Sequence, residues 1–275
     1  MSNTELTVEE IVRVAEGLWP LSGAEPWDAV GLISGNLKQA VTGIHLAVDA
    51  VPEVASEAIA FGAQVLLVHH PLLLRGVTTV AEDRFKGAVL SQLIRASCAL
   101  YCAHTNADVV ETGTSSELAK RLGLVDCQPI SAVPGTQLGI GRVGRLAEPV
   151  TLGRLARQLA QILPATASGI RVSGEFDQPI ENVALCAGSG DSYLEEPLVL
   201  ASDVYISSDL RHHPASAFRE TAKLNGGPAL IDISHWAAEW IWLETAAAEL
   251  RERLPGVNIT VSEIRTDPWD FAIVQ

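Results

Sequence analysis

The chain has 275 residues, an apolar content of 48% and a formal net charge of −14. This length is enough for one large domain or two smaller ones, and the apolar content is enough for a buried core, which excludes disorder over most of the chain. A field of negative sign repels phosphate backbones, so the composition argues against nucleic acid as a partner.

The cysteines and the hydropathy predict a soluble, cytoplasmic protein. The four cysteines form no C-x-x-C pair, and their scatter is typical of buried thiols in a reducing compartment. The longest run without a charged residue, Ala58–Leu74, contains histidines, a glutamine and a proline, which argues against a membrane span. The first residues lack the basic and apolar regions of a secretory signal.

The first part of the chain predicts alternating helices and strands. Thr7 and Glu10 have the spacing of a capping box, at the start of a helix that ends before Pro20. Apolar runs and helical patterns then alternate, at 41–48 (strand), 53–61 (helix), 65–68 (strand), 84–96 (helix) and 98–103 (strand). Strands separated by helices of this length indicate βαβ units and a largely parallel sheet.

The amino-acid composition changes at 126–134, where Pro, Gly, Gln and Ser are frequent, and this change indicates a second α/β unit. Its predicted strands are 138–146, 169–172, 183–187 and 203–207, and its predicted helices are 152–163 and 215–224. The last section predicts a strand at 229–233, a long Trp-rich helix at 235–254 and a strand at 257–264. We therefore predict an α/β protein with mostly parallel or mixed sheets, in which residues 1–128 together with 228–275 form one domain and residues 129–227 form the other.

The histidines follow the predicted strands instead of lying on the polar faces of helices. Apart from His45, each comes shortly after an apolar run: His69, His70, His104, His212, His213 and His235. In open parallel sheets, ligands bind beyond the carboxyl ends of the strands. Histidines placed there on neighbouring strands are therefore expected to converge on one crevice.

Carboxylates accompany these histidines at a spacing that suits metal binding. Asp108 follows His104 by four residues, and Glu239 follows His235 by four at the start of a predicted helix, where such positions share a face. Adjacent residues such as His69 and His70 point in different directions, so they serve two ions more naturally than one. Imidazole and carboxylate ligands suit zinc, manganese, iron, nickel or cobalt, and the number of ligands is what a two-metal centre needs.

Each of these patterns has an ordinary structural explanation when it is taken alone. A histidine pair at a strand end can simply bond to backbone carbonyls, and a histidine and a carboxylate four residues apart are common on helix surfaces. The presence of all the patterns at predicted sheet edges favours a metal site.

The same residues stand in ordered motifs that resemble the Nif-three-like (Ngg-one interacting factor three) family, whose members are often labelled GTP cyclohydrolase 1 type 2 homologs. Pro26-Trp27-Asp28, followed by Gly31, resembles the family signature near the start of the chain. The resemblance continues over essentially the whole chain in the family's H-H-P-L, H-T-x-x-D and H-Y-x-x-E elements, which here read His69-His70-Pro71-Leu72, His104-Thr105-Asn106-Ala107-Asp108 and His235-Trp236-Ala237-Ala238-Glu239.

The resemblance implies a ligand set and an assembly. Two divalent metal ions per chain would be held at the carboxyl ends of the strands by His69, His70, Asp108, His235 and Glu239, with His104 beside them. The resemblance also implies two α/β domains, a ring-shaped homohexamer, and the short form of the family, without the inserted middle domain of longer members. Ala29, Pro214 and Ser234 depart from the family pattern, but none of them is a predicted ligand.

Three other features have weaker functional interpretations. Gly139-Ile140-Gly141-Arg142-Val143-Gly144 matches G-x-G-x-x-G, but the next predicted helix comes too late for a dinucleotide fingerprint. Gly188-Ser189-Gly190-Asp191 is either an anion cradle or a plain strand-to-helix turn. The cluster of Trp236, Trp240 and Trp242 has the helical spacing of packing residues more than that of a stacking platform.

We predict a dinuclear metal-dependent hydrolase in which a metal-activated water attacks a nucleotide or a related small molecule. His104 and His213 are the predicted proton-transferring residues, because an imidazole titrates near neutral pH. The sequence leaves the native metal open among zinc, manganese, iron, nickel and cobalt. Two alternatives remain: a metal-binding, regulatory or metal-delivery protein without turnover, and a protein-interaction scaffold.

Overall fold

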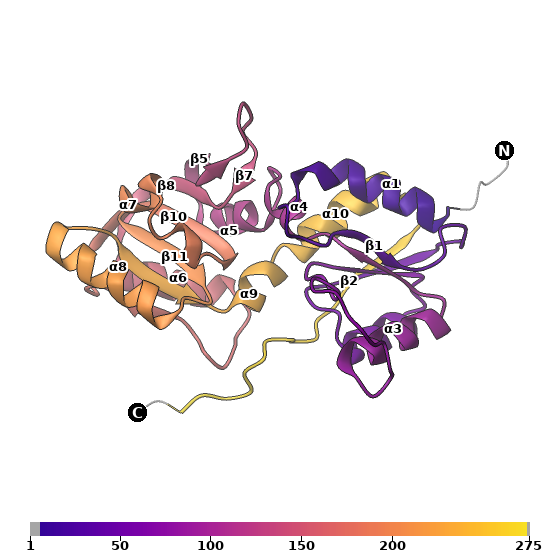
Figure 1. The fold of residues 1–275 in the computed structure, drawn as a ribbon. Helices are drawn as coiled ribbons and strands as arrows, with labels where there is room; N and C mark the ends of the chain where they lie inside the picture. The colour runs from indigo at the N-terminus through magenta and orange to yellow at the C-terminus, as the bar shows by residue number, and fades with distance from the viewer. Residues whose placement is uncertain (1–5, 274–275) are drawn as a thin grey trace. The chain divides into compact units, whose positions relative to one another are not determined.

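The computed structural model describes residues 6–273, and the chain divides into two compact units (Figure 1). The first unit consists of Met1–Ala107 and Leu243–Thr266, and the second unit consists of Asp108–Trp242 and Asp267–Gln275. Each unit is an α/β sandwich around its own sheet. The division is discontinuous in sequence, and its boundaries differ from the predicted ones at 128 and 228.

The sheet of the first unit is five-stranded and mostly parallel. In spatial order its strands are β1 (Gly31–Ser34), β4 (Ala99–Cys102), β3 (Val65–Val68), β2 (Gly43–Ala47) and β13 (Asn258–Val261). The four strands from β4 to β13 are parallel, and β1 pairs antiparallel with β4 at the edge. The central strands are buried on both faces, as expected for a parallel sheet covered by helices.

Helices cover both faces of this sheet. The helices of the first unit are α1 (Val8–Leu18), α2 (Pro52–Ala60), α3 (Phe85–Arg95) and α10 (Leu243–Arg253). α2 and α3 pack on one face, where Val54 and Leu93 join a buried cluster with Leu66 and Leu100 of the strands. α1 begins as predicted, since the Glu10 carboxylate accepts hydrogen bonds from the Thr7 backbone (2.8 Å) and hydroxyl (3.1 Å).

The sheet of the second unit is six-stranded and mixed. In spatial order its strands are β5 (Leu124–Gln128), β8 (Arg142–Thr151), β10 (Pro179–Ser189), β11 (Val204–Ser208), β12 (Ala229–Ile233) and β9 (Arg171–Ser173). β10, β11 and β12 are parallel neighbours, and the other pairings are antiparallel. A separate small sheet pairs β6 (Ser131–Ala132) with β7 (Gly139–Ile140).

The helices of the second unit cover its sheet, and some of them carry candidate site residues. They are α5 (Thr114–Leu122), α6 (Leu152–Ile162), α7 (Pro197–Leu200), α8 (His212–Asn225) and α9 (His235–Trp240); the short α4 (Thr105–Asp108) lies at the boundary between the units. α5 and α9 pack against β10, and α8 packs against β12. No helix within residues 6–273 is long and apolar enough to cross a membrane.

The predicted helix at 235–254 is wrong in one respect, because the structure divides it into α9 and α10. The break falls at Ile241 and Trp242, where the chain passes from the second unit to the first. The Trp242 indole donates to the Thr112 carbonyl at 3.0 Å, which fixes the side chain within the second unit. Strand β12, placed by the prediction with the first domain, instead pairs with β11 in the second unit.

Candidate metal-ligand groups

In the first unit, polar side chains follow three neighbouring parallel strands where each strand ends. Asp49 comes after β2, His69 and His70 after β3, and His104 after β4. These positions lie at the carboxyl edge of the sheet, as predicted. We call His69, His70 and His104 the first-unit cluster: one ring nitrogen of each lies within 4.8 Å of those of the other two, and the set is of a kind that can hold a metal ion.

Hydrogen bonds to Nδ1 orient all three rings of the first-unit cluster. His69 Nδ1 lies 2.8 Å from the Ala103 carbonyl oxygen, and His70 Nδ1 lies 2.8 Å from Oδ1 of Asp49. His104 Nδ1 lies 2.9 Å from Oδ1 of Asp28. A carbonyl or carboxylate acceptor at Nδ1 favours the tautomer that is protonated there, in which Nε2 carries the lone pair that can bind a metal ion.

Asp28 ties the predicted signature near the start of the chain to this cluster. Its side chain is fully buried, and it accepts from His104 Nδ1, from the Thr105 backbone (3.1 Å) and hydroxyl (2.5 Å), and from the Ala29 backbone (2.7 Å). Burial opposes ionisation of this carboxyl, but the hydrogen bonds from His104 and Thr105 outweigh it and hold the Asp28 pKa below its ordinary value of 3.8. Trp27 packs edge-on against His104, with ring centroids 6.0 Å apart.

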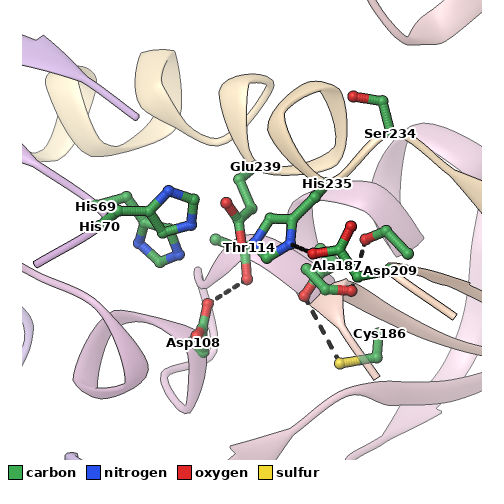
Figure 2. A network of polar contacts seen from close by, with 12 residues as sticks. His69, His70, Asp108, Thr114, Cys186, Ala187, Asp209, Ser234, His235 and Glu239 are labelled. Carbon is green, nitrogen blue, oxygen red and sulfur yellow. Dashed lines mark hydrogen bonds and ion pairs between the residues drawn. The ribbon is translucent and has the colours of Figure 1, made fainter. Parts of the chain in front are cut away.

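The second unit repeats this arrangement at the ends of β10, β11 and β12. Gly188 lies near the end of β10, Asp209 follows β11, and His235 follows β12 as the first residue of α9. His235 Nδ1 lies 2.7 Å from Oδ2 of Asp209, and its Nε2 lies 2.9 Å from Oε1 of Glu239, one turn along the helix (Figure 2). Two lone-pair atoms at that distance need a proton or a cation between them, which is a suitable place for a metal ion.

Ser234 holds the start of α9. Its hydroxyl oxygen accepts from the Ala237 backbone at 3.2 Å and its hydroxyl donates to Asp267 at 2.6 Å, so it is the N-cap of the helix. Ser234, which differs from the family pattern, therefore stabilises the helix that presents His235 and Glu239 on one face.

Asp108 and Glu239 lie in the same negative environment within the second unit. Burial is the main cause that raises the pKa of the Cys186 thiol well above its ordinary value, and the charges of Asp108 and Glu239 raise it further. The Asp108 carboxylate accepts from the Thr114 hydroxyl at 2.5 Å (Figure 2). We call Asp108, His235 and Glu239 the second-unit group. The ligand atoms of His235 and Glu239 lie within 4.8 Å of one another, and carboxylate oxygens with an imidazole nitrogen are donors that suit a divalent cation. Among residues 6–273, Asp108 belongs to no such set, so its role as a ligand stays a prediction.

The remaining candidates have other surroundings. His213 is exposed near the start of α8, and its ring packs against that of His212, with centroids 5.2 Å apart. Gly139 and Gly141 do not open a helix; their carbonyls accept, at 2.6 Å each, from the buried Arg142 guanidinium, so the glycine run has a structural role. Trp236 and Trp242 are buried, as expected for packing residues.

Sequence reasoning missed Asp49 and gave Asp209 and Gly188 no role in positioning ligands. Asp49 and Asp209 stand directly after apolar strands, so the rule that selected the histidines selects them too. Helix α5 was also missed, although Gly113 stands at its N-cap and Gly123 (φ +74°) terminates it in the left-handed conformation.

The chain matches proteins of one family along its length. A model of the family described as Duf34/NIF3 (NGG1p interacting factor 3) matches residues 6–268. A Streptomyces coelicolor protein named GTP cyclohydrolase 1 type 2 homolog is 42% identical over 269 residues, which cover 95% of this chain and 93% of that protein. A Clostridium perfringens protein of the same name is 31% identical, over 97% of this chain and 100% of that protein.

Solved structures support the same fold. A hypothetical protein of Staphylococcus aureus is 26% identical, with a TM-score of 0.86 over 98% of this chain and 100% of that chain. A Bacillus cereus protein related to NIF3 has a TM-score of 0.86 at 22% identity, over 98% of this chain and 99% of that chain.

Some relatives named GTP cyclohydrolase 1 type 2 homolog are longer than this chain. The Mycobacterium tuberculosis relative aligns over 372 positions at 29% identity, covering 95% of this chain and 96% of that protein. Because this chain has 275 residues, it is the short form.

Proposed function

The chain belongs to the Duf34/NIF3 family, and on that premise we propose that it is a dinuclear metal-dependent hydrolase. The proposed ligands of two divalent ions are those that the family resemblance implies, His69, His70, Asp108, His235 and Glu239, with His104 beside them. One observation carries it: each histidine of both groups has Nδ1 on an oxygen acceptor, which prepares Nε2 as a ligand.

The donor set fits the ions in charge as well as in chemistry. The second-unit group brings two carboxylates and one imidazole, and the acceptors Asp28, Asp49 and Asp209 add negative charge behind the imidazoles. Two divalent cations would offset this charge, and with imidazole and carboxylate ligands they would be zinc, manganese, iron, nickel or cobalt. When bound, such ions lower the pKa of a water molecule toward neutrality and polarise the bond under attack.

The chain's own residues then bind and orient the reactants. His104, with Nδ1 on Asp28, has Nε2 available to take or return a proton, and His213 is proposed for the same role on the second unit. In a chain of net charge −14, bound cations would supply the main attraction for an anionic substrate such as a nucleotide. The substrate class we propose is therefore a small anionic molecule, and the names of the curated relatives suggest a nucleotide.

The first test is the metal content of the purified chain together with a panel of nucleotide, phosphodiester and imine substrates. We expect about two equivalents of metal per chain, as in two-metal hydrolases, and hydrolysis that stops with a chelator and returns with metal. Glu239→Ala should lose metal and activity together. Glu195→Ala, which changes an exposed glutamate of the second unit, should change neither.

The outcomes separate the alternatives. Metal bound without turnover on any substrate favours a metal-storing, regulatory or metal-delivery protein. Biological function that survives a His69→Ala, Glu239→Ala double change favours an interaction scaffold. Less than half an equivalent of metal under metal-replete conditions contradicts the metal centre itself.

We further propose that the chain acts in the cytoplasm as a homohexameric ring. The support is the resemblance of the motifs that contain His69-His70, His104 and His235 to those of the Nif-three-like family, which implies such a ring. We expect native mass spectrometry of the purified chain to give six times its mass of 29.2 kDa. A monomer or dimer across micromolar concentrations would contradict the ring, and recovery of the chain from a membrane or secreted fraction would contradict the location.

A further inference from the structure

Two backbone positions at neighbouring strand ends of the second unit are left-handed. Gly188, near the end of β10, has φ +84°, and Asp209, directly after β11, has φ +54°. Glycine adopts this conformation freely, whereas it costs an aspartate free energy and is seen mostly where the surroundings impose it. Both residues lie next to the His235–Glu239 pair.

Gly188 approaches the Glu239 carboxylate so closely that no side chain fits between them. A Cβ atom on Gly188 would lie 2.5 Å from Glu239 Oε1 and 3.5 Å from His235 Nε2. The Gly188 carbonyl is held in place because it accepts from the hydroxyls of Ser207 (3.3 Å) and Ser208 (2.6 Å) on β11. The backbone of Gly188, which carries no side chain, therefore limits where the Glu239 carboxylate can lie.

Asp209 fixes the imidazole from the opposite side of the ring. Its carboxylate lies 2.7 Å from His235 Nδ1, while Nε2 of the same ring faces Glu239 (Figure 2). The left-handed turn at Asp209 comes one residue after Ser208, whose hydroxyl donates to Gly188. The two left-handed positions are therefore linked through β11, and they hold the two ligands from two directions.

We propose that Gly188 and Asp209 are the positioning residues of the His235–Glu239 pair. Gly188 sets the position of the Glu239 carboxylate by leaving room for it, and Asp209 sets the orientation and the Nδ1-protonated form of the His235 ring. This inference rests on the proposed role of His235 and Glu239 as metal ligands, but its steric part concerns the metal-free chain and is tested without metal.

The steric part is tested by a double-mutant cycle in chelator-treated protein. Gly188→Ala should lower the urea midpoint of unfolding more than Gly226→Ala does, because Gly226 has a similar φ of +70° but nothing within 4 Å of its Cβ position. In a Glu239→Ala background the excess cost of Gly188→Ala should disappear, since the clashing carboxylate is gone. If Gly188→Ala lowers the urea midpoint more than Gly226→Ala does by the same amount with and without Glu239, the proposed role of Gly188 is wrong.

The role of Asp209 is tested by zinc titration of the full chain. Asp209→Ala should weaken the binding of zinc 10- to 100-fold, as loss of a carboxylate behind a ligating histidine does. Asp209→Asn should recover much of this loss, because asparagine tolerates the left-handed backbone and still accepts a hydrogen bond. Asp126→Ala is the matched control: Asp126 has φ +56°, but its carboxylate accepts from Arg145.

A second readout separates positioning from general loss of structure. Nitrogen-15 shifts of the imidazoles in the zinc-loaded protein should show His235 protonated at Nδ1 in the native chain and in Asp209→Asn, and a mixture in Asp209→Ala. Unchanged zinc affinity and unchanged shifts in Asp209→Ala overturn its role. If Glu239→Ala binds zinc as the native chain does, the proposed function fails, while the metal-free cycle still decides the role of Gly188.

Discussion

His69→Ala should abolish the stabilisation that a divalent metal gives to this protein, whereas His45→Ala should leave it intact. A ligand that binds only the folded state at a hundred times its Kd stabilises it by about 2.7 kcal/mol. At about 2–4 °C per kcal/mol for chains of this size, the melting temperature should rise by roughly 5–10 °C on addition of metal. Removal of His69 deletes a ligand of the first-unit cluster, so the rise should vanish.

His45 is a matched control because it is equally buried in the same unit. Both histidines are 0% exposed, but His45 Nδ1 lies 2.7 Å from Thr260 Oγ1 and its Nε2 lies 2.9 Å from Glu57, so both nitrogens already have partners. Its replacement should cost about 1–3 kcal/mol through the groups left unpaired. Thermal scans of both variants with metal and with chelator provide the measurement. A full metal response in His69→Ala would contradict its assignment as a ligand.

The contrast between His69 and His45 shows how much the sequence could predict. The position of His69 directly after an apolar run indicated a strand end, and the structure places it after β3 at the carboxyl edge. His45 lies inside such a run, and the structure buries it within β2. Periodicity thus separated the histidine at the edge from the histidine in the core, because parallel strands buried on both faces have continuous apolar sequences.

The parts that sequence reasoning missed depend on tertiary contacts. The apolar pattern from His235 to Leu254 contains no glycine or proline, so no local signal announced the break at Ile241 and Trp242. The break accompanies the passage of the chain between units and the hydrogen bond from Trp242 to Thr112. Strand β1 was missed because its residues Gly31–Ser34 are few and mostly half-buried, which leaves a weak alternation.

The supporting residues behind the histidines were hidden for another reason. Spacing selects residues close together in sequence, such as His235 and Glu239. Asp28 is 76 positions from His104, and Asp209 is 26 positions from His235. Pairs of this kind become visible only when neighbouring strands bring their ends together, although the resemblance to a known family had already marked Asp28.

Replacement of Asp28 should give the largest loss of stability among the acceptors behind the histidines. Its fully buried carboxylate accepts from His104, from Thr105 twice and from Ala29. Asp28→Ala leaves these donors without an acceptor, and since each buried donor left unpaired costs about 1–3 kcal/mol, the total loss should be about 3–5 kcal/mol. Asp28→Asn retains one acceptor oxygen and should cost about 1.5–3 kcal/mol.

The pH dependence of the unfolding free energy shows whether the charged form of Asp28 provides this stabilisation. Because the folded chain holds the Asp28 pKa below the ordinary 3.8, the stabilisation is fully present above that value and is lost as the pH falls through it toward the folded-state pKa. The difference in unfolding free energy between the native chain and Asp28→Asn should therefore be constant at pH 5–7 and shrink below about pH 4. Urea unfolding across this range measures it, with the exposed Asp83→Asn as the control. A difference that is independent of pH down to the acid limit would show that the Asp28 charge does not hold His104 and Thr105.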